Sequence, residues 1–75
     1  MNIEKDCVDY LKRLGLRLKA IRAAKGWTLE QTEDHGWTSW RHLQKAESGK
    51  NITIATLWKI SKVYGVSVAD ITKGL

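Results

Sequence analysis

The stretch from Thr38 to Lys50 concentrates polar side chains on one side of a possible helix. If Thr38 or Ser39 opens that helix and Ser48-Gly49 ends it, a turn of about 100° per residue separates two faces. One face would hold Arg41, Gln44, Lys45 and Ser48, with His42 at its edge. The other would hold Leu43 and Ala46, flanked by Trp40 and Glu47, and could pack on a small core. Guanidinium, amide and ammonium groups read base edges and bind phosphates, so the spacing predicts a DNA recognition helix.

The composition limits the chain to one modest core and favours an anionic partner. Its 75 residues include 13 Lys and Arg against 8 Asp and Glu, a net charge of +5. Nucleic acid is the commonest partner of so basic a small domain, although surface charge that only aids solubility is an alternative. A chain of this size buries only about 60% of its unfolded surface, so dimerisation is an expected source of stability.

Other classes of function find little support in the sequence. Cys7, His35 and His42 lack the spacing of metal ligands, and we expect no metal and no cofactor. No nucleophile with its base, phosphate-binding glycine loop or pair of catalytic carboxylates is found, so neither an enzyme nor a small-molecule ligand is expected. The apolar runs are too short for a membrane span and no secretory pattern is present, which favours a soluble, cytoplasmic protein.

Apolar spacing and the absence of proline predict a single all-α domain of five helices over residues 1–75. The first helix would begin at a cap formed by Asp6, with Asp9 in its first turn, and end at Gly26. Its apolar stripe would consist of Cys7, Tyr10, Leu11, Leu14, Leu18 and Ile21. Gly15 lies within this stripe, which indicates close approach of another backbone.

A short second helix should precede the predicted recognition helix. Thr28-Leu29-Glu30-Gln31 matches a capping box, which predicts a helix from Leu29 to His35. The turn Gly36-Trp37-Thr38 would then lead into the helix over residues 39–47. Two short helices joined by a three- or four-residue turn that contains glycine form a helix-turn-helix.

The remaining elements supply most of the predicted core. Thr53 should cap a helix over residues 54–64, which ends at Gly65, and Ser67 should cap a last short helix before Gly74. The apolar face of the longer helix would be Ile54, Leu57, Trp58, Ile60 and Tyr64. Trp27, Trp37 and Trp58 are expected as core fillers, whereas Trp40 fits the core or a thymine methyl group equally well.

Arg22 and Glu47 fall on the buried sides of their respective helices. Each charge would be costly to bury alone, so the two side chains are expected to pair, with two separately solvated side chains as the alternative.

From Leu14 onward the chain resembles the phage lambda repressor/Cro-like (Xre-type) helix-turn-helix family. The segments that carry the resemblance are LGLRLKAIRAAKGWT, WRHLQKAESGK and TLWKISKVYGVSVADI. It implies a five-helix DNA-binding core over about residues 14–75, with residues 1–13 as a helical extension. It also implies a homodimer on a two-fold operator, with the third helix in the major groove. An Arg–Glu bridge at Arg22 and Glu47 is part of the same family pattern.

The resemblance also assigns candidate DNA contacts by position. Base contacts fall on the N-terminal part of the third helix and its polar face: Ser39, Trp40, Arg41, Gln44 and Lys45. Phosphate contacts fall on the loop after that helix, at Lys50 and Asn51, and further candidates for phosphate binding are Thr28, Thr38 and His42. Arg41 is the best candidate for bidentate binding to guanine, with a phosphate clamp as the alternative.

The chain departs from the family pattern around its second helix. Leu29 replaces the usual phosphate-binding glutamine, Thr32 replaces an apolar residue, Glu33 replaces a small one, and Trp37-Thr38 replaces a Gly-Val turn.

The expected function is therefore sequence-specific repression or control of transcription by a homodimer on an inverted repeat. The dimer surface could involve residues 66–75, with residues 1–12 as a competing candidate. A protein-binding module on the same fold, such as an antitoxin-like partner or an adaptor, is the alternative function. An RNA-binding role lacks the usual aromatic sheet or GXXG loop.

Overall fold

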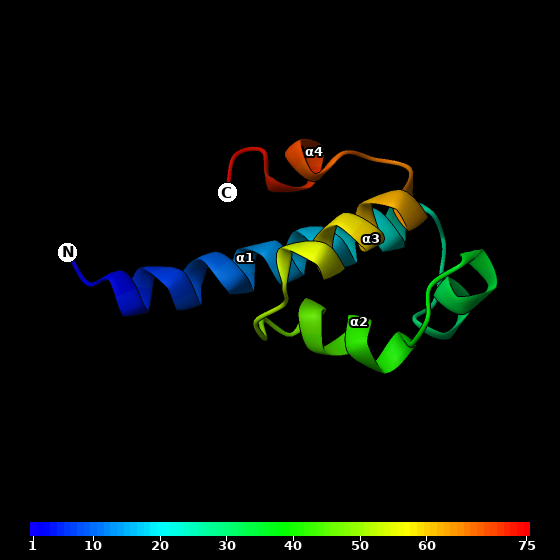
Figure 1. Ribbon diagram of the computed structural model, residues 1–75, viewed down its shortest axis with the longest axis horizontal. Helices are drawn as coiled ribbons and strands as arrows, with labels where there is room; N and C mark the ends of the chain where they lie inside the picture. Colours follow the sequence, from blue (N-terminus) through cyan, green and yellow to red (C-terminus); the bar gives the residue numbers. More distant parts are fainter.

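Every regular element of the protein is helical (Figure 1). The computed structural model describes all 75 residues as α1 (Ile3–Ala24), η1 (Glu30–His35), α2 (Trp40–Glu47), α3 (Ile54–Tyr64) and α4 (Val68–Thr72). The predicted all-α architecture of five helices is thus confirmed. None of the helices combines the length and the apolar character that crossing a membrane requires.

The start of α1 differs from the prediction, because Asn2 rather than Asp6 caps the helix. The side-chain carbonyl of Asn2 accepts a hydrogen bond from the backbone N–H of Lys5 at 3.0 Å. An asparagine in this position satisfies one of the free N–H groups at a helix start. Asp6 instead lies in the first turn with Glu4, where the helix dipole favours negative charge.

The first turns of α1 extend beyond all the other helices (Figure 1). Cys7 and Tyr10 are therefore exposed, and the prediction that they belong to the buried stripe is wrong. Their spacing is apolar and helical, but the core of the domain does not extend over this end of α1. Burial along α1 begins at Leu14 and continues through Leu18.

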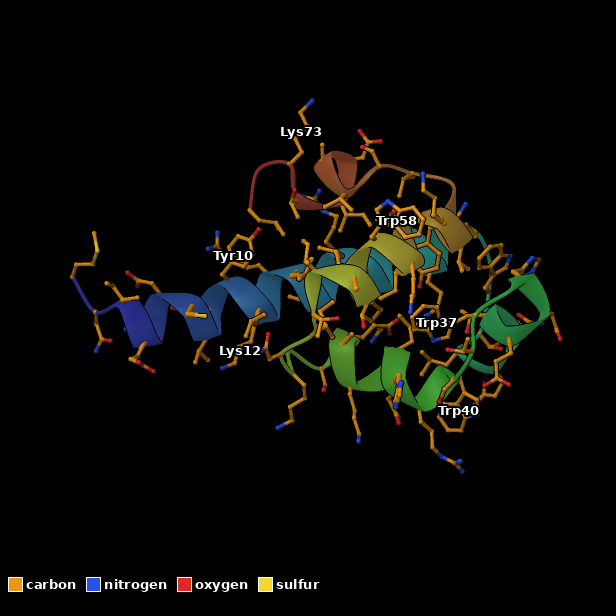
Figure 2. The ribbon with its side chains drawn as sticks, in the orientation of Figure 1. Tyr10, Lys12, Trp37, Trp40, Trp58 and Lys73 are labelled. Carbon is orange, nitrogen blue, oxygen red and sulfur yellow. The ribbon has the colours of Figure 1, made fainter.

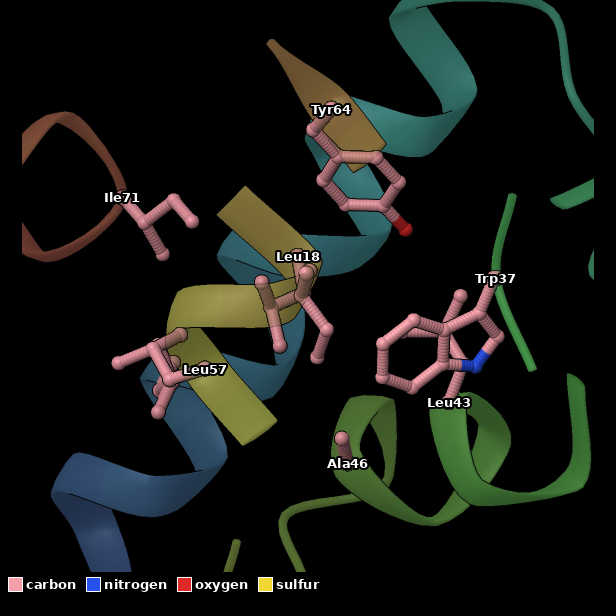
Figure 3. Close-up of a cluster of buried hydrophobic side chains, with 9 residues drawn as sticks. Leu18, Trp37, Leu43, Ala46, Leu57, Tyr64 and Ile71 are labelled. Atoms are coloured by element: carbon pink, nitrogen blue, oxygen red, sulfur yellow. The ribbon is translucent and has the colours of Figure 1, made fainter. Parts of the chain in front are cut away.

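The core joins side chains from four helices and from the turn before α2 (Figure 3). Its buried members are Leu14, Leu18, Trp37, Leu43, Ala46, Leu57, Ile60, Tyr64 and Ile71. Trp37 is a core filler as predicted, and Trp27 packs against the cluster at its edge. Trp58 and Ile54 are 55% and 74% exposed, so their predicted burial is wrong. The body covers only one side of α3, the side that carries Leu57 and Ile60.

Hydrogen-bonded caps define the ends of α3 and α4. The hydroxyl of Thr53 accepts from the N–H of Thr56 at the start of α3, and Gly65 ends that helix with a φ of 70°. In α4, Ser67 and Asp70 form a reciprocal capping box. Hydrogen bonds from the backbone and the hydroxyl of Ser67 lower the pKa of Asp70.

Gly15 is the point of closest approach between α1 and α2. A Cβ placed there would lie 2.5 Å from the backbone oxygen of Glu47 and 2.6 Å from that of Ala46. Both neighbours are backbone atoms, which cannot swing aside as a side chain would. The predicted close approach is confirmed, and it fixes how near the C-terminal end of α2 sits to α1.

Replacing Gly15 by alanine should therefore destabilise the protein. Alanine gains about 1 kcal/mol of helix propensity over glycine. The clash with two carbonyl groups outweighs this gain, and we expect the free energy of unfolding to fall by about 1–3 kcal/mol. Urea unfolding followed by circular dichroism measures the change, with Leu16→Ala at an exposed position of the same helix as the control. Equal stability of Gly15→Ala and the wild type would contradict the observed packing.

Tyr64 is buried in the core with a hydroxyl group that has no hydrogen-bond partner. Burial raises the pKa of Tyr64 well above its ordinary value, and the negative charge of Glu47 acts in the same direction. The folded state therefore keeps this phenol neutral at pH values where the unfolded chain ionises it.

The free energy of unfolding should consequently fall as the pH rises above about 10, where a phenol in the unfolded chain loses its proton. Tyr64→Phe should remove part of this slope, because phenylalanine has no proton to lose. Near neutral pH the same variant should be as stable as the wild type or slightly more stable, since it removes an unsatisfied polar group. Urea unfolding at pH 7 and at alkaline pH measures both effects. Tyr10→Phe is the control, and an unchanged alkaline slope in Tyr64→Phe would count against the buried neutral phenol.

Candidate nucleic-acid interface

The predicted division of α2 into two faces is present in the structure. Leu43 and Ala46 are buried against the core, while Arg41, Gln44 and Lys45 are exposed. Ser48 and His42 are exposed beside them. The helix therefore holds its apolar side in the body and presents a guanidinium, an amide and an ammonium group to the outside.

A carboxylate from η1 caps the start of α2. Ser39 occupies the cap position without making a side-chain cap hydrogen bond. Instead, Oε2 of Glu33 accepts from the backbone N–H of Trp40 at 2.8 Å. The sequence showed only that Glu33 departs from the family pattern. An acidic residue seven positions before the first residue of α2 was the available signal, but only the fold brings the two together.

The departures within η1 are accommodated by local hydrogen bonds. The Thr28–Gln31 capping box forms as predicted, with the N–H of Thr28 donating to Gln31 Oε1 at 2.8 Å and the N–H of Gln31 donating to Thr28 Oγ1 at 3.1 Å. The element that follows is a 3₁₀ helix rather than an α-helix. Thr32 is fully buried, and its hydroxyl donates to the carbonyl of Leu29, so the polar group is satisfied.

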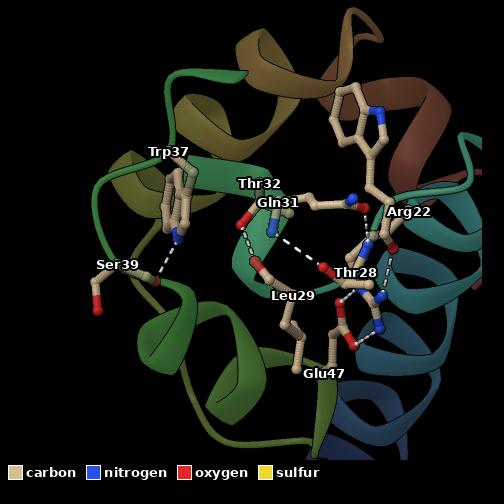
Figure 4. A network of polar contacts seen from close by, with 9 residues as sticks. Arg22, Thr28, Leu29, Gln31, Thr32, Trp37, Ser39 and Glu47 are labelled. Carbon is tan, nitrogen blue, oxygen red and sulfur yellow. Dashed lines mark hydrogen bonds and ion pairs between the residues drawn. The ribbon is translucent and has the colours of Figure 1, made fainter. Parts of the chain in front are cut away.

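A bidentate ion pair fastens the other end of α2 to α1 (Figure 4). Arg22 donates from Nε to Glu47 Oε2 at 2.7 Å and from Nη2 to Glu47 Oε1 at 2.9 Å. Its Nη1 donates to the carbonyl of Trp27 at 2.8 Å. The two side chains are only 12% and 7% exposed, so the pairing inferred from the sequence is observed and solvent is largely excluded. The hydrogen bond to Glu47 raises the pKa of Arg22.

A shallow hollow of about 280 Å³ lies at the C-terminal end of α2. Two groups of predicted DNA contacts meet there, His42 and Lys45 from α2 and Lys50 and Asn51 from the following loop. Thr28 and Thr38 are exposed and lie just before η1 and α2, respectively. The hydroxyl of Thr28 already accepts the hydrogen bond of the capping box.

Trp40 is partly buried and lies outside the core cluster. Figure 2 shows it at the edge of the molecule that α2 forms, with Lys73 at the opposite edge. The guanidinium carbon of Arg41 lies 5.0 Å from the centroid of the Trp40 ring. This cation–π contact holds the arginine against the indole and restricts its orientations.

The histidines and the cysteine do not gather into a metal site. The ring of His35 stacks on Trp27 at 3.8 Å between ring centroids, whereas His42 lies on α2 and Cys7 on the projecting part of α1. The structure contains no group of three or more His, Cys, Asp or Glu side chains placed to hold a metal ion.

The geometry defines a small all-helical domain with a helix-turn-helix whose second helix presents one polar face to the outside. A helix-turn-helix family model matches residues 18–71. The chain therefore belongs to the helix-turn-helix family of the Cro/C1 type, a family of DNA-binding transcription regulators that are typically not enzymes. The resemblance to lambda repressor/Cro-like proteins is thus confirmed. Comparisons with curated proteins and with solved structures return no match.

The contribution of the Glu33 cap to the free energy of unfolding should be measurable. We expect Glu33→Ala to lower the free energy of unfolding by about 1 kcal/mol, because α2 then loses the acceptor for its first N–H. Glu33→Gln should lose less, since an amide oxygen can still accept that hydrogen bond. Urea unfolding gives both values. Glu30→Ala is the matched control, because Glu30 is exposed on the same 3₁₀ helix. Equal losses in Glu33→Ala and Glu30→Ala would argue against the cap.

Proposed function

We propose that this protein is a transcriptional repressor or controller that binds an inverted-repeat operator as a homodimer. In this proposal α2 enters the major groove, and two copies read half-sites one helical turn apart. The observation that carries the proposal is the exposure of Arg41, Gln44 and Lys45 on a helix whose other side is locked into the core. The net charge of +5 supplies the part of the affinity that does not depend on sequence.

The proposed contacts divide by chemistry into two groups. Ser39, Trp40, Arg41, Gln44 and Lys45 would meet base edges, and Thr28, Thr38, His42, Lys50 and Asn51 would meet phosphates. Arg41 is the leading base reader, because a guanidinium can donate two parallel hydrogen bonds to O6 and N7 of guanine. Its contact with Trp40 supports this role, since a restricted side chain loses less conformational entropy on binding.

Selection of bound fragments from a random duplex pool would identify the operator. The proposal predicts an inverted-repeat consensus and an affinity that falls log-linearly with salt concentration. Arg41→Ala should weaken operator binding by about 1–3 kcal/mol while weakening non-specific binding less.

Lys73→Ala is the matched control, because it also removes one positive charge but lies at the opposite edge of the molecule (Figure 2). This control should retain the operator preference. An equal loss on operator and random DNA in Arg41→Ala would make Arg41 a phosphate clamp rather than a base reader. Failure to bind any duplex would favour a protein-binding module instead.

A further inference from the structure

The projecting part of α1 carries an apolar stripe whose first three members, Ile3, Cys7 and Tyr10, are exposed in the single chain. Ile3, Cys7, Tyr10 and Leu14 follow one another at intervals of four, three and four residues, the spacing of a coiled-coil seam. Ile3 is 73% exposed, and Cys7 and Tyr10 are also exposed. The stripe runs without a break into Leu14, which is buried in the body. Three turns of isolated helix are marginally stable in water, so a partner for this stripe would stabilise the whole segment.

We propose that α1 of a second copy of the chain covers this stripe in an antiparallel arrangement. The seam would then contain a central layer, occurring twice, in which Cys7 meets the partner's Tyr10, while Ile3 of each copy would lie over the partner's chain at the level of its buried Leu14. This pairing would form the dimer surface of the proposed DNA-binding homodimer, and it rests on the proposed function only for the role that the dimer plays. Pairing itself requires no DNA.

The charges beside the stripe match an antiparallel pair. Asp6 and Arg13 lie seven residues apart on the same flank of α1. In the register that pairs Ile3 with the partner's Leu14, Asp6 of each copy faces the partner's Arg13. In a parallel pair the residue across from Asp6 would instead be Leu11. Arg13 donates from one Nη atom to the carbonyl of Leu75, which leaves its other donors available.

A groove at the base of the projecting helix would receive the end of the partner. Its volume is about 430 Å³, and its walls include Tyr10, Leu14, Ile54, Leu57 and Val68. In the same register the partner's Ile3 would lie over this groove, one wall of which Leu14 forms. An apolar side chain placed there would also shield Ile54, which is 74% exposed in the single chain.

The same arrangement places both α2 helices on one face of the dimer. Gly15 and Arg22, where α2 meets α1, lie about 100° around α1 from the stripe. The two-fold axis of an antiparallel pair is perpendicular to the plane of the two helices, so both α2 helices project to the same side of that plane. This axis passes between the two α1 helices, on average about ten residues along α1 from these contacts. At about 1.5 Å per residue on each side of the axis, the two α2 helices are then about 30 Å apart along the pair. Successive major grooves are about 34–36 Å apart.

Sedimentation equilibrium of the full chain without DNA tests the surface directly. The wild type should form a dimer, and Ile3→Glu should weaken self-association roughly 100-fold or more, because the change removes two copies of a buried apolar side chain. A glutamate in the first turn is favourable for a helix, so the variant should fold, which circular dichroism verifies. Val8→Glu is the matched control, since Val8 is exposed on the same helix but away from the stripe. It should dimerise like the wild type.

Charge reversal tests the orientation of the two helices. Asp6→Arg and Arg13→Asp should each weaken the dimer, and the double variant should restore much of the lost affinity because the opposite charges face each other again. A wild type that stays monomeric at every soluble concentration would overturn the inference. So would a dimer that Ile3→Glu leaves intact, or a double variant as weak as the sum of its single changes. If Ile3→Glu dissociates the dimer but the wild-type dimer binds no DNA, the result would support this surface and refute only the proposed function.

Discussion

The position of α2 depends on how its C-terminal end is joined to α1. Gly15 lets the two backbones come close, and the Arg22–Glu47 ion pair holds them there with little water present. The close approach and the ion pair depend on each other. Without the close approach the two charges could not meet, and a lone buried charge would destabilise the fold strongly. The exposed face of α2 points outward because this junction fixes the opposite face.

This junction also connects the three parts of the proposed mechanism. One side of α1 packs against α2, the adjoining side carries the core residues Leu14 and Leu18, and the exposed N-terminal continuation of that side is where we propose that a second copy binds. One continuous helix thus relates the proposed DNA-reading surface to the proposed dimer surface. In the proposed dimer, bending or shifting α1 would change both the spacing and the orientation of the two α2 helices at once.

Most of the fold could be predicted from local signals. Helix limits followed from Thr53, Ser67 and Gly65, whose roles depend only on neighbouring residues. The Arg22–Glu47 pair was also predictable, because each charge fell on the apolar side of its helix. The exposure of Cys7 and Trp58 was not, since periodicity shows which residues share a face but not how far the body extends over it.

The site shows the same division between local and tertiary information. The two faces of α2 follow from its spacing alone, and the structure agrees. The role of Glu33 required the fold, because a cap supplied by another element leaves no fixed interval in the sequence. Glu33 stands out in the sequence because it departs from the family pattern, but that pattern does not predict what the residue does.

Both ends of α2 are therefore secured by groups that lie elsewhere in the chain, Glu33 at its start and Arg22 at its finish. An eight-residue segment has almost no helical tendency of its own in water. The exposed polar face of α2 consequently exists only as long as η1 and α1 are in place, and it should melt together with the rest of the molecule rather than fray ahead of it. A peptide copied from this segment alone would be a disordered, basic chain that could bind DNA without distinguishing one sequence from another.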